Sequence, residues 1–198
     1  FSGLTVPAGS TGAFTVEYSV ASLPTVTQAL PVYVLPTSLE VTTAKPTTEG
    51  AFIGGVYYTE SSSPAAIVTP AAVLAQLNAA VDVTLQTSTT NIGGGIRING
   101  GSTVNTNGDV TIGSKNSGNS YTFNQGTINA QGNLTLLGKS TGDGIYMQDS
   151  GGTGSKIVGT NGANITLDGT SSGGGTGVSL SINTSTNSIT TTGTNAGA

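Results

Sequence analysis

Cysteine and histidine are both missing from the 198-residue chain, and arginine occurs once, at Arg97. Without cysteine the chain can form neither a disulfide framework nor a thiol nucleophile. Without histidine it lacks the commonest general base and the commonest metal ligand. We therefore expect a protein that is not an enzyme, with no catalytic residues, no metal and no cofactor.

Charge and long apolar runs are also scarce. Only 7% of residues are charged and the net charge is −4, whereas globular chains carry about 25% charged residues. Nucleic-acid binding requires a basic surface, which this composition excludes. No apolar run approaches the roughly 18 residues of a membrane-spanning helix. The chain begins with Phe1 and no signal peptide, so we expect a mature chain or a piece of a longer one.

Threonine, valine and isoleucine runs separated by glycine and asparagine indicate β structure throughout. Seven of the ten aromatic residues lie in residues 1–58, and 25 of the 31 glycines lie in residues 93–198. This change in composition predicts two differently built parts. We expect an N-terminal β domain at 1–60, a connector with one short helix at 61–80, and a parallel β-helix at 81–198.

The first part contains several strand patterns and one helix pattern. Alternating apolar residues and bounding prolines predict strands at 14–20, 31–35, 39–43 and 52–58. The segment 70–79 is predicted to be a helix, because Thr69 can cap it and Pro70 suits its first position. Such a short helix must dock on another element, and we expect it to cap one end of the second part.

Three sets of short segments recur along the second part. The first set shares the pattern Asp/Asn–apolar–Thr–apolar and comprises 82–85, 109–112, 133–136 and 164–167. The second comprises 96–98, 121–123, 145–147 and 178–180, and the third begins at Val104, Ile128, Ile157 and Ile189. The spacing is about 24 to 31 residues, and self-similarity at such a period is typical of repeat architectures.

Three short strands in each repeat predict about four three-sided coils of a parallel β-helix. Each strand would pair with its counterpart about 4.8 Å away in the next coil. Alternation would direct the apolar residues of the first set inward and its central threonines outward. The Asp or Asn that begins each segment would lie at a corner. The open ends of so short a stack favour continuation or contact with another subunit.

The sequence resembles a known family at these repeats. "VNTNGDVTIGS" (104–114), "INAQGNLTLLG" (128–138) and "GANITLDG" (162–169) are similar to repeats of filamentous-haemagglutinin-type adhesins of two-partner secretion. The stretch 68–92 also resembles a segment of that family, so that the likeness covers roughly 68–192. It implies a right-handed parallel β-helix, export to the bacterial cell surface or extracellular fibres, and a shaft without catalytic residues. The family's secretion-signal domain is not recognisable in residues 1–60, and the chain is shorter than typical members.

One outward-facing patch is the candidate binding site. The central residues of the second set, Arg97, Thr122, Tyr146 and Ser179, are predicted to lie on one face in successive repeats. Tyrosine and arginine are enriched at interfaces, so the patch could contact a sugar or a protein. The simpler alternative is an ordinary surface. Asp82 and Asp109 could stack as a Ca²⁺ or acid–base pair, but Asn133 and Asn164 replace them further along, which favours a corner role.

Three functions remain open from the sequence. The first is an exported, non-enzymatic cell-surface adhesin or a segment of its shaft, with a glycan or protein of a host or neighbouring cell as its partner. The second is a structural subunit that assembles with copies of itself into an extracellular filament or biofilm matrix fibre. The third, a polysaccharide-active β-helix enzyme, is disfavoured because histidine and a carboxylate cluster are missing.

Overall fold

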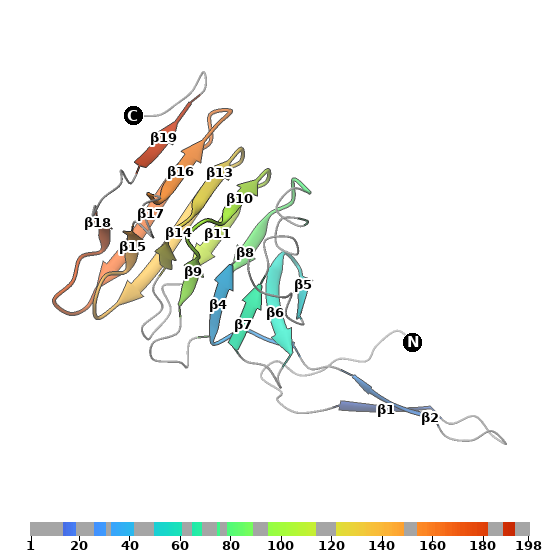
Figure 1. Ribbon diagram of the computed structural model, residues 1–198. Helices are drawn as coiled ribbons and strands as arrows, with labels where there is room; N and C mark the ends of the chain where they lie inside the picture. The colour runs from blue at the N-terminus through green and yellow to red at the C-terminus, as the bar shows by residue number, and fades with distance from the viewer. Residues whose placement is uncertain are drawn as a thin grey trace.

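The computed structural model describes residues 14–18, 26–30, 33–41, 50–60, 65–68, 75, 79–88, 95–113, 122–148, 154–181 and 188–192. Within these ranges the chain is built almost entirely of β-strands (Figure 1). The predicted all-β class with parallel sheets is therefore confirmed. The predicted helix at 70–79 lies outside the described residues except for Ala75 and Ala79.

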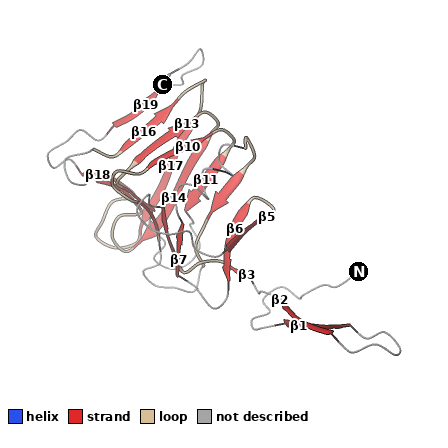
Figure 2. Ribbon diagram, turned by 45° about the vertical axis from the view of Figure 1, so that its right-hand side comes forward, coloured by secondary structure: helices blue, strands red, loops and turns tan. Residues whose placement is uncertain are grey.

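The strands form three sheets and one separate hairpin. Sheet 1 contains, in spatial order, β17 (Ile165–Ser171), β14 (Leu134–Ser140), β11 (Val110–Gly113), β8 (Val83–Leu85), β6 (Val56–Glu60) and β3 (Tyr33–Val34), with β5 (Gly50–Ile53) also on β6. Sheet 2 contains β18 (Val178–Ser181), β15 (Ile145–Gln148), β12 (Thr122–Asn124), β9 (Ile96–Ile98), β4 (Ser38–Val41) and β7 (Ala65–Val68). Sheet 3 contains β10 (Thr103–Thr106), β13 (Thr127–Ala130), β16 (Lys156–Gly159) and β19 (Ser188–Thr191), which run side by side in Figure 2. The hairpin is β1 (Phe14–Tyr18) with β2 (Val26–Leu30).

From β8 onward the chain visits the three sheets in a fixed order four times. The repeats are β8–β10, β11–β13, β14–β16 and β17–β19, and equivalent strands pair in parallel. The first predicted set is confirmed in register, with Val83, Val110, Leu134 and Ile165 aligned in sheet 1. The third is confirmed as well, with Val104, Ile128, Ile157 and Ile189 aligned in sheet 3.

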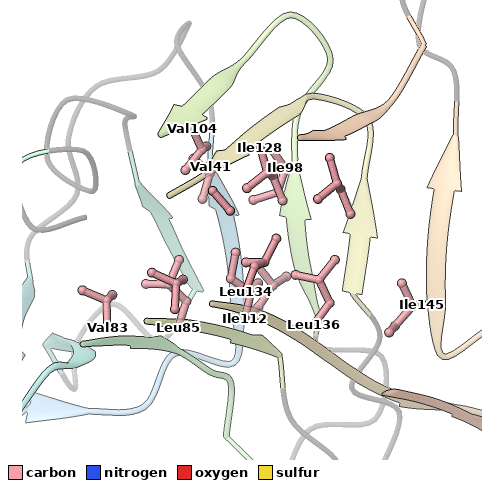
Figure 3. Close-up of a cluster of buried hydrophobic side chains, with 14 of the residues drawn as sticks. Val41, Val83, Leu85, Ile98, Val104, Ile112, Ile128, Leu134, Leu136 and Ile145 are labelled. Atoms are coloured by element: carbon pink, nitrogen blue, oxygen red, sulfur yellow. The ribbon is translucent and has the colours of Figure 1, made fainter. Parts of the chain in front are cut away.

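One apolar core lies between the sheets, and Figure 3 shows side chains from several strands converging on it. Alternation along each strand produces it, because every second side chain points to the same face. In β14 this alternation buries Leu134 and Leu136 completely and leaves Thr135 partly exposed. The predicted threonine ladder, Thr84, Thr111, Thr135 and Thr166, is also in register. Burying each large apolar side chain contributes about 1.5 to 3 kcal/mol.

The sheets continue across the boundaries that the composition suggested at residues 60 and 80. β4 pairs in parallel with β9, so that Leu39 and Val41 extend the buried columns of Ile96 and Ile98. β6 pairs with β8 in the same way. β7 lies inside the predicted connector and pairs with β4. The physical reason is that the first repeat has strand edges and apolar side chains that need partners, and these N-terminal strands supply them.

Candidate functional site

The structure brings together three of the four residues of the candidate patch. Arg97 and Tyr146 both align with residue 123 of β12, and Ser179 aligns with Tyr146. Arg97 is exposed, whereas Tyr146 and Ser179 are half-buried. We call these three residues the sheet 2 column. They come from β9, β15 and β18, and parallel pairing alone places them in one line on the sheet.

The fourth residue, Thr122, is not part of the column, and its predicted exposure is wrong. Thr122 is 0% exposed and aligns with the core residues Ile96 and Ile145. Its hydroxyl donates a hydrogen bond to the carbonyl oxygen of Leu137 at 2.6 Å. The side chain therefore joins sheet 2 to sheet 1, and Phe123 holds the strand position that aligns with Arg97.

The register of β12 differs by one residue from the prediction because its two buried side chains are polar and form hydrogen bonds. Asn124, at the end of β12, is fully buried, and its Oδ1 accepts the backbone N–H of Gly126 at 3.1 Å. Its Nδ2 lies 3.5 Å from the carbonyl oxygen of Lys156. Both inward side chains of β12 are thus polar and satisfied by backbone groups. The apolar alternation of the segment 121–123 indicated the opposite orientation.

A carboxylate lies next to the single arginine of the column. Glu40 on β4 aligns with Arg97 on the adjacent strand β9. Directly opposite residues in neighbouring strands have side chains within interaction range. The amide of Asn99 donates a hydrogen bond to Glu40 Oε1. The column therefore has mixed charge at one end and polar groups at the other, which suits a neutral, hydroxyl-rich or peptide surface better than a polyanion.

The predicted corner role of the Asp/Asn positions is confirmed for Asp109, Asn133 and Asn164. Asp109 Oδ1 accepts the backbone N–H of Asn133 at 2.9 Å, and Oδ2 accepts the Asn133 side-chain amide at 3.2 Å. Asn133 Oδ1 accepts the backbone N–H and the side-chain amide of Asn164, both at 3.1 Å. The side chains of Asp109 and Asn133 thus bind the following repeat, that of Asn164 binds the preceding one, and both oxygens of Asp109 are engaged.

A second amide pair was missed by the sequence interpretation. Asn129 Nδ2 donates to Asn105 Oδ1 at 2.8 Å across β10 and β13 of sheet 3. Both side chains are half-buried on the outer side of the strands. The signal is present in the matching triplets at 104–106 and 128–130, where an asparagine follows Val104 and Ile128, the first two apolar residues of the third set.

A further cross-repeat contact is made by Asp143, in the loop before β15. Its Oδ1 accepts the backbone N–H of Thr176 at 2.8 Å and the Thr176 hydroxyl at 2.9 Å. These two hydrogen bonds, with a smaller contribution from the Ser179 hydroxyl, hold the pKa of Asp143 below its usual value of 3.8. Ser179 of the sheet 2 column therefore also helps to join the third and fourth repeats.

The depressed pKa of Asp143 predicts a pH effect on stability. The ionised carboxylate is favoured in the folded chain, so its contribution is present above the usual value of 3.8 and is lost as pH falls through the lower folded value. Asp143→Asn keeps an acceptor but removes the charge. We expect the variant to be less stable than the wild type at neutral pH, and the difference to shrink below about pH 4. Urea unfolding across this pH range measures it, and a constant difference would contradict the assignment.

Other site types find no support among the residues described. That part of the chain contains no group of three or more His, Cys, Asp or Glu side chains placed to hold a metal ion. It also contains no helix long and apolar enough to cross a membrane. Comparison with protein-family models, with curated proteins and with solved structures finds no match.

Proposed function

We propose that this chain is a shaft segment of an exported, non-enzymatic bacterial surface protein of the adhesin type. In this proposal the three sheets form a right-handed β-solenoid of about four three-sided coils, which hold a contact surface away from the cell. The observation that carries it is the parallel, in-register pairing of four successive repeats in all three sheets. Such stacking produces a rod whose length is set by the number of repeats.

The polar groups support a structural role. Asp109, Asn133 and Asp143 each use side-chain oxygens to bind a backbone N–H of the following repeat. A carboxylate that serves in acid–base catalysis or in Ca²⁺ binding must keep lone pairs available for the substrate or the ion. Here Asp109 uses both of its oxygens, and Asp143 uses its Oδ1, to join successive repeats. The chemistry of these side chains is therefore that of a scaffold.

The sheet 2 column is the surface that we assign to the partner. It combines an exposed guanidinium at Arg97 with the ring of Tyr146 on a sheet face. Guanidinium and phenol groups supply directional hydrogen bonds together with flat apolar area. A surface glycan or a protein of a neighbouring cell is the class of partner that fits these groups.

Surface labelling of intact cells tests the export on which the proposal depends. Antibodies raised against the purified chain are applied to cells that produce the native protein, before and after permeabilisation, and detected by immunogold electron microscopy. Equal labelling of intact and permeabilised cells is expected. Labelling only after permeabilisation would place the chain inside the cell and would remove the adhesin assignment.

A second candidate function is a subunit of an extracellular fibre. It is favoured by one observation, the uncovered apolar side chains of the fourth repeat, such as Leu180, which is 50% exposed. A fibre requires joining surfaces at both ends of the stack. Electron micrographs of the same labelled cells distinguish the two functions, because a fibre subunit marks long filaments and a shaft segment marks the cell envelope.

A further inference from the structure

Asparagine followed directly by glycine occurs at three places among the described residues. The pairs are Asn99–Gly100, Asn107–Gly108 and Asn161–Gly162. In such a pair the side-chain amide can react with the backbone nitrogen of the next residue, because glycine has no Cβ to hinder the approach. The reaction requires that nitrogen to be free of hydrogen bonds and the local chain to be able to turn. The surroundings of the three glycines therefore decide which asparagine can react.

Two of the three glycines are held in place. The backbone N–H of Gly162 donates a hydrogen bond to the carbonyl oxygen of Thr192 at 3.3 Å. Gly108 is half-buried, and a Cβ on it would lie 2.3 Å from the carbonyl oxygen of Val81, so its backbone is packed against that residue. Both glycines must leave these contacts before the preceding asparagine can react.

Gly100 is exposed and lies in a turn that leaves its nitrogen free. The N–H of Ser102 donates to the carbonyl oxygen of Asn99 at 3.1 Å, which closes a β-turn over residues 99–102. Gly101 has a φ of 78° and lies in open space, with nothing within 4 Å of the place where a Cβ would stand. No described residue accepts a hydrogen bond from the N–H of Gly100. Gly100 therefore has the freedom that the other two glycines lack.

Asn99 joins two distant parts of the chain. Its side-chain amide donates a hydrogen bond to Glu40 Oε1, and its backbone N–H donates to the carbonyl oxygen of Val41 at 2.9 Å. Both acceptors belong to β4, which lies beside β9 in sheet 2 (Figure 1). Arg97 aligns with Glu40 across the same two strands. A chemical change at Asn99 therefore acts on the junction between the N-terminal strands and the first repeat.

We propose that Asn99 is a site of spontaneous deamidation, and that its conversion to a carboxylate weakens the junction of β4 with β9. The Gly100 nitrogen attacks Cγ of Asn99, the Cγ–Nδ2 bond breaks, and the amide nitrogen leaves as ammonia with the proton lost by the Gly100 nitrogen. The product is a cyclic imide. A water molecule then adds to one of the two carbonyl carbons of the imide, and the ring opens to aspartate or to isoaspartate.

Either product loses the contact that holds Asn99 against Glu40. An aspartate places a second carboxylate where an amide donated to the first, and like charges on neighbouring strands are destabilising. An isoaspartate also lengthens the main chain by a methylene group, which disrupts the turn that Ser102 closes. The local charge around Arg97 changes from balanced to negative, since two carboxylates then lie near one guanidinium.

Peptide mapping by mass spectrometry measures the reaction at each asparagine while the purified chain is incubated at mildly alkaline pH. We expect Asn99 to convert at least about fivefold faster than Asn161, the factor that one net hydrogen bond at Gly162 contributes. Gly100→Ala keeps the turn, because the positive φ belongs to Gly101, and should slow conversion at Asn99. Absence of conversion, equal rates at the two asparagines, or no effect of Gly100→Ala would overturn the site.

Asn99→Asp tests the consequence separately from the rate. We expect its urea midpoint to lie below that of the wild type at neutral pH, and the difference to shrink below about pH 4, where one protonated carboxyl can donate to the other. Asn161→Asp adds the same charge at an exposed turn and should change the midpoint little. An unchanged midpoint for Asn99→Asp, or an equal fall in both variants, would overturn the effect on the junction. Neither measurement depends on export of the chain, so surface labelling tests the proposed function independently.

Discussion

Leu136→Ala is expected to lower the free energy of unfolding by about 3 kcal/mol, because a buried leucine leaves a cavity that the neighbours fill only in part. Leu136 is 0% exposed and lies on β14, next to the edge strand β17 of sheet 1, between Ile112 and Leu167 in the adjacent strands. Both of those strands are fixed by their own hydrogen bonds, so collapse around the cavity is limited. For a chain of this size the thermal midpoint should fall by about 6 to 10 °C.

Two variants of neighbouring positions serve as controls for Leu136→Ala. Thr135→Ala changes the outward side chain of the same strand and should cost less than about 1 kcal/mol. Leu167→Ala changes the same column one repeat later, where the side chain is only partly buried, and should cost clearly less than Leu136→Ala. Equal effects at Leu136 and Leu167 would show that the fourth repeat is covered as well as the third.

Gly138→Ala is expected to destabilise the chain by about 2 to 3 kcal/mol for the opposite reason, which is overpacking. A Cβ at Gly138 would lie 1.9 Å from the carbonyl oxygen of Gly144 and 2.5 Å from its carbonyl carbon. Both contacts are with backbone, which cannot rotate away as a side chain can. The same approach recurs one repeat later, where a Cβ at Gly169 would lie 1.9 Å from the Gly177 carbonyl oxygen.

The matched control for Gly138→Ala lies four residues along the chain. A Cβ at Gly142 would meet only the Ser140 hydroxyl oxygen, at 3.8 Å, which is an ordinary contact. Gly142→Ala should therefore change stability little, or raise it slightly by restricting the unfolded chain. Thermal unfolding followed by circular dichroism separates the two variants. If Gly142→Ala were as damaging as Gly138→Ala, loss of backbone freedom rather than close approach would be the cause.

The repeated part of this fold is predictable because the same residue pattern occurs once in each of the four repeats. The pattern Asp/Asn–apolar–Thr–apolar predicts that the apolar side chains are buried, that the threonine faces outward and that the Asp or Asn lies at the corner. The alignment of Val110, Leu134 and Ile165 therefore follows from the residue pattern alone. The corner role of Asn133 follows from the same comparison, since an asparagine can replace an aspartate as acceptor but not as a metal ligand of equal strength.

The orientation of β12 and the pairing of β4 with β9 depend on contacts that a local sequence pattern does not predict. Thr122 and Asn124 point inward because the backbone carbonyl groups of Leu137 and Lys156, which lie 15 and 32 residues further along the chain, satisfy them. Alternation of apolar residues cannot reveal such partners. The strand at 38–41 is visible in local alternation, but its pairing with β9 joins residues far apart in sequence and has no repeat motif to mark it. For the candidate site, the repeat pattern predicts Arg97 and Tyr146 on one face, whereas the Glu40 neighbour emerges only from that pairing.

The register of the repeats has a consequence for how such a chain folds and lengthens. From β8 onward, each strand finds its partner in the next repeat only 24 to 33 residues away, as the cross-repeat hydrogen bonds at Asn133, Asn164 and Thr176 show. The entropy cost of closing a loop depends on that separation and not on the total length. A gene that gained a whole repeat by duplication would add a strand to every sheet at an unchanged cost per repeat. Insertion of half a repeat would break all three columns, so length in this architecture changes in whole units.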